Sequence, residues 1–385
     1  MHGAANVGVH TGRKSPAPRL AEAGAPNALP SHRSAQPDEV RDARASGLTY
    51  VHDDAPGISR LRAGRSFRYR MPDGHCVRDA KAIDRITALA IPPAWSDVWI
   101  CTSANGHLQA TGRDAKGRKQ YRYHAAWRST RDSGKFDRVV SFGQQLPKLR
   151  AAVRKALAAP GFPREKVIAM VVAVLADTLI RVGNAAYAKE NNSFGVTTLR
   201  NRHVDFVQGG RAQFHFKGKS GKTHDIALDD KRLVKLIRKC QQLPGQALFQ
   251  YIDENDKRTP VESGDVNAWL REIAGDDFTA KDFRTWAGTS IAFRRFCETP
   301  LPEGVQGKPP SERALASIEK AIVAEIAEVL GNTVAVCRKS YIDPAVFEAW
   351  RQGKLSNVQA RTRGPRQWEA ETLAFLKRAR RAKHR

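Results

Sequence analysis

The chain of 385 residues is long enough for two or three domains, and a hydrophobic share of 41% is ordinary for a globular protein. The charge is unusual, because 65 Lys and Arg residues against 39 Asp and Glu residues give a formal net charge of +26. This excess predicts a polyanionic partner, nucleic acid before an anionic membrane. The longest apolar run, residues 167–176, is shorter than the roughly 20 residues that a membrane crossing needs and predicts a buried helix.

The N-terminus and the cysteines predict a reducing environment. The N-terminus lacks the apolar core of a signal peptide, and the five cysteines are scattered and form no C-x-x-C pair. This pattern indicates the cytosol and argues against a cysteine zinc site. We therefore expect a cytoplasmic, nucleoid-associated protein without a membrane span.

Residues 1–45 are rich in Ala, Pro, Arg and Ser and follow no sustained period, which predicts a disordered tail. Order is expected to begin a few residues later. Phe67 and Tyr69 alternate with arginines as in a strand, and Asp79 is predicted to cap a helix that runs to Ala90.

The next part of the chain predicts a β-rich N-terminal domain. Two short apolar stretches, 98–101 and 108–111, flank Asn105-Gly106, a strong hairpin signal because both residues tolerate positive φ. Residues 112–124 interleave cations and aromatics with glutamine, which suits the phosphates, sugars and base edges of DNA. The alternative is a solvated basic loop, and only the global charge favours DNA.

Residues 129–135 are small and polar and predict a linker. Helices are predicted after it, over 145–158 and from Pro163 to Arg181, the second closed by Gly183. Arg181 would then lie in the last turn of its helix, where a cation often does no more than complement the helix dipole.

Alternating residues on both sides of the Gly-Gly pair at 209–210 predict a β-hairpin, and the next tight turn, 219–222, places Lys219 at a loop tip. Two sequences near this turn imitate the end of a phosphate-binding P-loop. The glycine that the motif requires five residues earlier is Gln213 in one case and Phe216 in the other. We therefore reject ATP or GTP binding at this turn.

Thr279 and Asp282 resemble a capping box that starts a helix running to about Cys297. Arg284 falls at the border of the apolar stripe of this helix. An arginine at such a border commonly covers the edge of the core, which is the structural alternative to a functional role.

A long amphipathic helix is predicted to end at Gly331, and Thr333 can cap a short helix that follows it. The pair Asp343-Pro344 starts another helix, so Tyr341 falls at a helix junction, where a tyrosine can face a cleft. On periodicity alone, the more frequent case is a boundary aromatic with its hydroxyl in water.

A lysine at a loop tip, two arginines, an asparagine and a tyrosine stand in a defined order: Arg181, Lys219, Arg284, Asn332 and Tyr341. With this set the chain resembles the type IB DNA topoisomerases of the compact, poxvirus-like kind found in bacteria, over roughly residues 46–345. The motifs that carry the resemblance are Arg181-Val182-Gly183-Asn184, Phe216-Lys217-Gly218-Lys219, Lys281-Asp282-Phe283-Arg284-Thr285-Trp286, Ser340-Tyr341 and the groove-contacting segment Gly117-Arg118-Lys119-Gln120-Tyr121-Arg122-Tyr123.

The resemblance implies a role for each residue. Tyr341 would attack a DNA phosphodiester to form a 3′-phosphotyrosyl enzyme, while Arg181 and Arg284 would stabilise the transition state. Lys219 would act as the general acid for the 5′-oxygen. Neither ATP nor another cofactor nor a metal ion is expected. The residues expected to bind DNA are Arg118, Lys119, Gln120, Tyr121, Tyr123 and Lys281.

At Asn332 the chain departs from the poxviral pattern, which has histidine, although bacterial members with asparagine are known. Asparagine can donate a hydrogen bond to a nonbridging phosphate oxygen but cannot titrate. We therefore expect histidine at this position to keep substantial activity and alanine to lose it.

The predicted fold is α+β, with a small β-rich N-terminal domain and a larger, mostly helical catalytic domain of the tyrosine recombinase and topoisomerase IB kind that carries a β-hairpin. We expect a tail at 1–45, a DNA clamp at 46–131, the catalytic domain at 132–345, and a C-terminal helix with a solvated basic tail at 346–385. The expected partner is double-stranded DNA, bound by a monomer without nucleotide or membrane.

Two alternatives remain. A tyrosine recombinase uses an analogous Arg, Lys, Arg, Tyr set, but it carries histidine three residues before the second arginine, where this chain has Lys281, and its N-terminal domain is helical. A noncatalytic basic DNA-binding protein would explain the charge but not the ordered set of residues.

Overall fold

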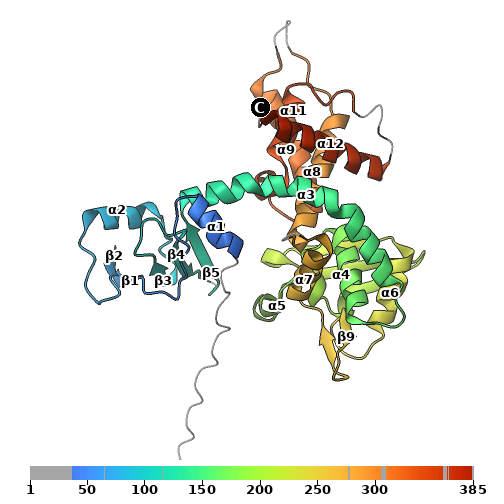
Figure 1. Ribbon diagram of the computed structural model, residues 1–385, viewed down its shortest axis with the longest axis horizontal. Helices are drawn as coiled ribbons and strands as arrows, with labels where there is room; N and C mark the ends of the chain where they lie inside the picture. The colour runs from blue at the N-terminus through green and yellow to red at the C-terminus, as the bar shows by residue number, and fades with distance from the viewer. Residues whose placement is uncertain are drawn as a thin grey trace, which may run out of the picture. The chain divides into compact units, whose positions relative to one another are not determined.

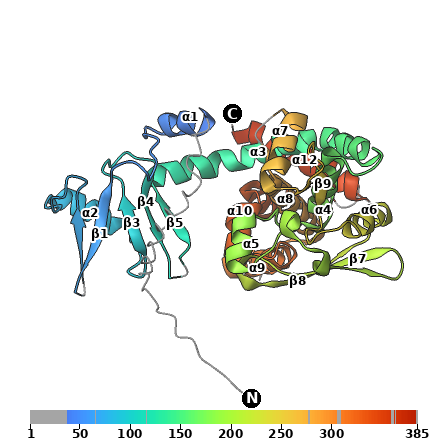
Figure 2. The same ribbon diagram turned by 90° about the horizontal axis from the view of Figure 1, so that it is seen from below.

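The structure is a computed structural model that describes residues 37–383, except residues 65, 116, 276–277, 305–308, 359–361 and 363. The chain divides into two compact units, Met1–Thr130 and Arg131–Arg385. Figures 1 and 2 show the sheets and helices of each unit from two directions.

A single helix, α3 (Ala125–Leu157), runs through the boundary between the two units. The linker predicted over 129–135 is therefore wrong, and the helix predicted over 145–158 is only the second half of α3. Helix formation is cooperative, so a short polar stretch continues a helix when its neighbouring turns are already helical.

The N-terminal unit is built on a five-stranded antiparallel sheet in the order β2-β1-β3-β4-β5. One face packs on α2 (Ala80–Ala88), whose Ile86 joins Ile100 in the buried core. Asp79 caps this helix as predicted, by accepting a hydrogen bond from the Ala82 N–H. The strands are β1 (Ile58–Ala63), β2 (Ser66–Arg70), β3 (Ser96–Ile100), β4 (Leu108–Arg113) and β5 (Lys119–Tyr123).

The predicted hairpin forms between β3 and β4, where Trp99 pairs with Thr111. Its connection is not the expected two-residue turn, because neither Asn105 nor Gly106 has positive φ. A longer loop joins the strands. Gly106 is needed there because a Cβ would lie 2.6 Å from the Cys101 sulfur.

The first described element, α1 (Pro37–Ala45), lies within the segment that was predicted to be a disordered tail. Ala43 of α1 is buried together with Leu48 and with Trp127 of α3, so the prediction is wrong for residues 37–45. Burial against an indole offsets the ordering entropy of a short helix, and this partner is distant in sequence. Residues 1–36 lie outside the described part of the chain.

The second unit has two hydrophobic cores that share α8 (Ala280–Glu298). In the first core, Phe283 and Trp286 of α8 pack with α4 and with the three-stranded antiparallel sheet β6-β7-β8. The regular elements around this core are α4 (Arg164–Thr178), α5 (Ala185–Asn191), β6 (Val204–Val207), β7 (Arg211–Lys217), β8 (Thr223–Leu228), α6 (Lys231–Gln241), β9 (Gln250–Ile252), β10 (Arg258–Pro260) and α7 (Ser263–Ala274).

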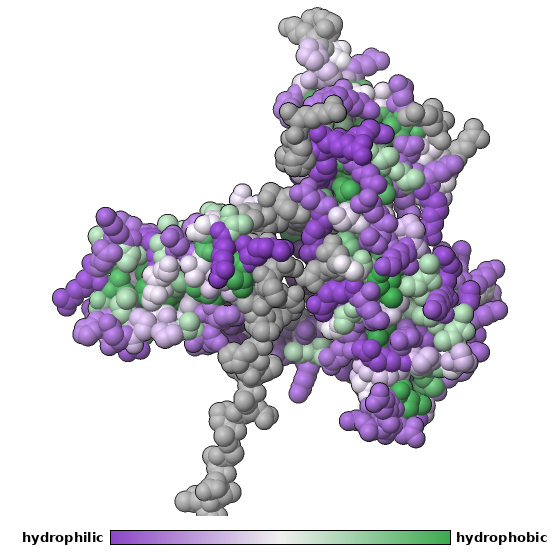
Figure 3. All heavy atoms as spheres, in the orientation of Figure 1, coloured by the Kyte–Doolittle hydropathy of each residue, from purple (hydrophilic) through white to green (hydrophobic). Residues whose placement is uncertain are grey.

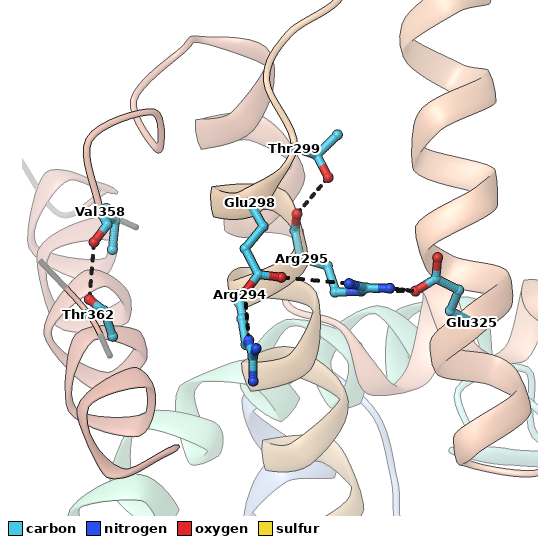
Figure 4. Close-up of polar contacts among 7 residues, drawn as sticks. All are labelled: Arg294, Arg295, Glu298, Thr299, Glu325, Val358 and Thr362. Atoms are coloured by element: carbon cyan, nitrogen blue, oxygen red, sulfur yellow. Dashed lines mark hydrogen bonds and ion pairs between the residues drawn. The ribbon is translucent and has the colours of Figure 1, made fainter. Parts of the chain in front are cut away.

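In the second core, Phe293 and Phe296 from the other end of α8 pack with the last four helices of the chain. At the surface, Arg295 of α8 donates from Nε to Glu325 of the next helix at 2.9 Å (Figure 4). This ion pair links the helices without burying charge. The four helices are α9 (Glu312–Val329), α10 (Val334–Tyr341), α11 (Pro344–Arg351) and α12 (Pro365–Lys383).

The C-terminal basic segment is part of the folded unit and not a solvated tail as predicted. Trp368 and Leu376 of α12 are buried. Arg380 of the same helix bonds the buried Asp343 and pairs with Asp137 of α3 at 2.8 Å. The run of cations obscured the apolar positions that lie between them at helical spacing.

The surface shown in Figure 3 is mostly hydrophilic, with apolar residues in small separate patches. No helix in the described part of the chain is long and apolar enough to cross a membrane. All five cysteines are free, and only Cys76 is exposed.

Candidate active site

Arg181 lies in an extended segment directly after α4 and not in the last turn of that helix, as was predicted. The helix ends because Leu179 adopts the left-handed conformation, with φ of 55°. Backbone hydrogen bonds then fix the segment: the Arg181 carbonyl accepts from Val196 at 2.9 Å, and the Val182 carbonyl accepts from Thr197 at 2.7 Å. A role for Arg181 that is limited to its own helix dipole is therefore excluded.

Arg181 contacts the turn that follows α9. Its Nη2 donates to the Gly331 carbonyl at 3.2 Å and to Oδ1 of Asn332. A guanidinium can only donate, so the amide oxygen of Asn332 faces it and the amide nitrogen points elsewhere. That nitrogen, Nδ2, is buried and has no hydrogen-bond partner among the described residues. A buried donor without a partner is costly, and an acceptor on a ligand would satisfy it.

Arg284 is only 4% exposed, although the sequence predicted it at the border of an apolar stripe. From α8, its guanidinium donates to the Leu179 carbonyl at the end of α4 and, at 2.6 Å, to the Leu330 carbonyl at the end of α9. Carbonyls at helix C-termini have no partner within the helix and carry the negative end of its dipole, so they bind a cation well. The period of one helix could not reveal these partners because they belong to two others.

Tyr341 is the last residue of α10, half-buried at the helix junction as predicted. Its carbonyl accepts a hydrogen bond from the Thr289 hydroxyl at 3.2 Å. Gly288 permits this approach of α8, because a Cβ there would lie 2.6 Å from the Tyr341 carbonyl oxygen. The ring centroid lies 5.3 Å from the guanidinium carbon of Arg284. The tyrosine is therefore fixed beside the buried arginine, at the edge of the second hydrophobic core.

The charges around the phenol favour its ionised form. Burial raises the pKa of Tyr341, but Arg284, which also bonds the phenol, and then Arg181 and Lys281 bring it below its ordinary value of 10.0. Burial and the neighbouring Arg284 also lower the pKa of Arg181. In the described part of the chain, neither of these two arginines forms an ion pair with a carboxylate, so the pocket presents uncompensated positive charge that an anion would relieve.

Lys219 is exposed at the tip of the turn between β7 and β8, as predicted. It lines one small pocket together with Arg181 and Arg284. The structure thus brings three of the five predicted catalytic residues to one pocket. The other two, Asn332 and Tyr341, are joined to it through their contacts with the arginines.

Sequence reasoning missed His224 of β8, which lines the same pocket. Its ring stacks on Phe216 with the centroids 5.1 Å apart. Burial lowers its pKa, and the charges of Arg181, Arg284 and Lys222 lower it further. The signal was present in the sequence, because pairing of the two predicted strands places His224 opposite an apolar residue of β7.

The segment predicted to contact DNA forms β5 and the turn before it, and three of its polar side chains are bonded to carboxylates. Arg118 and Gln120 both donate to Asp114, at 2.8 Å and 3.0 Å. Lys119 pairs with Asp53 at 2.5 Å. These groups would have to exchange a carboxylate for a phosphate in order to bind DNA.

The aromatic residues of β5 are more accessible. Tyr121 is 47% exposed, and its ring stacks on Tyr123 with the centroids 6.0 Å apart. Lys281, the remaining residue predicted to bind DNA, is exposed in the first turn of α8 in the second unit. Its charge acts on the Tyr341 phenol, which ties it to the catalytic pocket.

A much larger cavity, of about 1310 Å³, lies beside α10, α11 and α12. Arg338 and Lys339 are among its lining residues, but none of the five predicted catalytic residues is. This cavity is therefore separate from the predicted catalytic residues. The pocket lined by Arg181, Lys219 and Arg284 is far smaller, with a volume of about 10 Å³.

Comparison with known families gives two matches. The family described as eukaryotic DNA topoisomerase I, catalytic core, matches residues 124–363. The family described as bacterial DNA topoisomerase IB, N-terminal domain, matches residues 66–114.

Individual proteins agree with these matches. A DNA topoisomerase 1B of Acanthamoeba polyphaga mimivirus is 34% identical over 299 residues, which cover 77% of this chain and 88% of the relative. The DNA topoisomerase I of monkeypox virus is 23% identical over 292 residues, covering 74% of this chain and 87% of the relative. A DNA topoisomerase 1B of vaccinia virus is 22% identical over 294 residues, with the same two shares, 74% and 87%.

The mixed helical and sheet fold and the family matches define the class: the protein is an enzyme, a DNA topoisomerase. More closely, the chain belongs to the type IB DNA topoisomerase family. The resemblance to the poxvirus-like kind found in bacteria is confirmed by the viral relative and by the match of the bacterial N-terminal domain.

Proposed function

We propose that the protein relaxes supercoiled DNA by cleaving one strand transiently through a 3′-phosphotyrosyl intermediate, without ATP or a metal ion. Family membership supports DNA as the substrate. The observation that carries the chemistry is the arrangement of Arg181 and Arg284, which backbone carbonyls hold beside Tyr341. Arginine donors that are fixed before the substrate binds can stabilise the charge of a transferring phosphoryl group.

In the cleavage step, the Tyr341 oxygen attacks the phosphorus and forms a new P–O bond, and the bond from phosphorus to the 5′-oxygen breaks. The phenol proton passes to water, a loss that the lowered pKa of Tyr341 favours. Lys219 donates a proton to the departing 5′-oxygen. Resealing is the reverse reaction, in which the 5′-hydroxyl attacks, its proton returns to Lys219, and the tyrosine leaves. One phosphoester replaces another, so no nucleotide has to supply free energy.

Each remaining group has a place in this step. Arg181 and Arg284 neutralise the nonbridging oxygens, and the unpaired Nδ2 of Asn332 donates a hydrogen bond to one of them. A neutral donor that is already held by Arg181 needs no reorganisation when charge develops. Torsion in the duplex then turns the free end around the intact strand, which relaxes supercoils of either sign.

We assign DNA clamping to residues 46–131, where Tyr121 is exposed on β5, and catalysis to residues 132–345. Residues 346–385 would support the catalytic part through α12. The enzyme would act as a monomer on double-stranded DNA, at the nucleoid. The strong positive charge supports a sequence-independent contribution to binding that weakens as salt rises.

The test is relaxation of supercoiled plasmid in EDTA without ATP, comparing the wild type with Tyr341→Phe. We expect relaxation by the wild type and none by the variant, with DNA binding retained. Denaturation during the reaction should trap the wild type covalently on the 3′ end of a 5′-labelled cleavage product. Tyr251→Phe, in the β9 strand away from the pocket, is the matched control and should keep full activity.

Three results would contradict the proposal. Relaxation by Tyr341→Phe would show that Tyr341 is not the nucleophile. A strict need for ATP or a divalent metal would refute that part of the mechanism. Strand exchange between two duplexes by paired protomers would favour a recombinase.

A further inference from the structure

The ring of His224 lies between two turns that carry catalytic residues. A Cβ added at Gly218, directly before Lys219, would lie 2.5 Å from Cδ2 and Nε2 of His224. A Cβ added at Gly331, directly before Asn332, would lie 2.5 Å from Cε1 of the same ring. The imidazole edge therefore touches the backbone of both turns, and each contact point is a glycine.

Two further contacts fix the imidazole and the turn over residues 219–222 that carries Lys219, which we call the lysine turn. On its own sheet, His224 pairs with Phe216 across β7 and β8, and the two rings stack at an interplanar angle of 19°. The lysine turn has a second link to the turn after α9, because Nζ of Lys222 donates to the Asn332 carbonyl at 3.3 Å. Lys219 itself is exposed, so its own side chain does little to hold the turn in place.

We propose that His224 is a positioning residue for Lys219: its ring is the spacer that sets the lysine turn at the correct distance from the turn that carries Asn332. The inference rests on the proposed role of Lys219 as the general acid. Histidine suits the place because it is flat enough to stack on Phe216 and small enough to fit against two glycines.

The charges around the ring require that it be neutral. Burial keeps the pKa of His224 below its ordinary value, and the charges of Arg181 and Arg284 in the pocket and of Lys222 in the preceding turn lower it further. Lys219 lines the same pocket. A protonated imidazole would add another cation to this group and push the lysine turn away.

The experiment compares two DNA substrates in single-turnover cleavage. One is ordinary DNA, and in the other sulfur replaces the 5′-bridging oxygen at the scissile phosphate. A thiol has a pKa of about 8.5, so it leaves without a general acid. On ordinary DNA we expect both Lys219→Ala and His224→Ala to be slower by about 10²-fold, since small displacements of a catalytic group cost about that much. On the sulfur substrate, both should return to within about threefold of the wild-type rate, because proton donation no longer limits the reaction.

Controls separate positioning from a general loss of structure. His224→Phe keeps a flat ring that can stack on Phe216, although the ring is larger, and should cleave ordinary DNA faster than His224→Ala. His215→Ala, on the exposed side of β7, should match the wild type on both substrates. DNA affinity and thermal unfolding should be the same for His224→Phe and the wild type.

A double-mutant cycle adds an independent measurement. Gly218 has φ of −98°, so alanine fits its backbone, and the overlap with His224 is the only cost that the described contacts predict. Gly218→Ala should be slow on ordinary DNA and restored by sulfur. Its effect should largely disappear in the His224→Ala background, because residues in contact give non-additive effects.

The outcomes distinguish the two levels of the proposal. If Lys219→Ala is restored by sulfur but His224→Ala is not, the positioning role of His224 is overturned while the general acid stands. If Lys219→Ala is not restored, the general-acid assignment itself fails. Additive effects of Gly218→Ala and His224→Ala would also overturn the proposed role of His224 as a spacer.

Discussion

Two regions of this protein gather cations, and they hold them in opposite ways. In the pocket of the second unit, Arg181 and Arg284 are fixed by backbone carbonyls. On the N-terminal sheet, Arg118 and Lys119 are fixed by carboxylates. A carbonyl orients a guanidinium without cancelling its charge, whereas a carboxylate does both.

The difference matches the task proposed for each region. A phosphate in the pocket meets donors that are already aimed and uncompensated, which is what stabilising a transition state requires. A phosphate at the N-terminal face has to displace a carboxylate first, so the net gain is small and sensitive to salt. The comparison predicts that changes in the pocket affect the chemical step, and changes in the sheet affect binding.

After loss of the nucleophile itself, the largest effect is expected for Arg284→Ala, which should slow single-turnover cleavage by about 10³-fold. The variant removes a transition-state donor and leaves the Leu179 and Leu330 carbonyls without their partner, at a cost of about 1–3 kcal/mol for an unsatisfied buried group. Arg284→Lys keeps the charge but cannot span both carbonyls, so it should recover only part of the rate. A rate close to wild type for Arg284→Ala would refute the claim that the arginines of the pocket act on the chemical step.

A smaller loss, about 10²-fold, is expected for Asn332→Ala. Asn332→His restores a donor and should keep substantial activity. Asn332→Asp would introduce a carboxylate beside Arg181 and compensate its charge, so it should be slower than Asn332→Ala. Cleavage assays at saturating DNA measure all three, and equal loss in the histidine and alanine variants would refute the donor role.

On the N-terminal sheet, Tyr121→Ala should weaken duplex binding by about tenfold, because aromatic contacts with nucleic acid are worth about 1–3 kcal/mol. The cleavage rate at saturating DNA should not change. Leu61→Ala, another exposed apolar residue of the same sheet, is the control and should bind as the wild type does. A slower chemical step in Tyr121→Ala would contradict the division between the two regions.

The smallest effect is expected for Asp53→Asn, which should change the free energy of unfolding by less than about 1 kcal/mol, as for most partly exposed ion pairs. Releasing Lys119 from its partner should strengthen DNA binding slightly at low salt. Titrations at several salt concentrations measure this, and weaker binding by the variant would contradict it.

The same variant predicts a dependence on pH. Burial raises the pKa of Asp53, but the hydrogen bonds from Lys119 and Thr111 and the charge of Lys119 bring it below its ordinary 3.8. A carboxyl with a lowered pKa contributes stability above its unfolded pKa and loses it as the pH falls through the folded pKa. Between about pH 5 and about pH 3, the wild type should therefore lose more stability than Asp53→Asn. Parallel loss in the two proteins would show that the ion pair does not contribute.

Local signals in the sequence were reliable where the physical cause is itself local. Asp79 and Thr333 start helices as predicted, because each side chain accepts a hydrogen bond from a backbone N–H three residues away. Thr279 also starts its helix as predicted, and there the Asp282 side chain accepts from the Thr279 N–H. Gly331 ends α9 for a similar reason, since its φ of 59° suits a residue without Cβ. The order of the five catalytic candidates was also readable, because it needs no coordinates.

Predictions failed where the cause is distant in sequence. The helix over 37–45 forms because Ala43 meets Trp127, and the burial of Arg284 depends on carbonyls of α4 and α9. His224 was missed although its pairing with Phe216 is local, because its contact with the catalytic turn after α9 is made through Gly331, more than a hundred residues later.

By itself, the sequence determined the excess of positive charge, the hairpin that presents Lys219, the helix junction at Tyr341 and the family to which they point. Turn residues and capping residues act over only a few positions, and composition needs no structure, so all three can be read from the sequence alone. Only the tertiary structure decided that the ends of α4 and α9 meet at Arg284 and leave its charge uncompensated. That outcome depends on helix ends brought together by packing of the two cores, which no local pattern encodes.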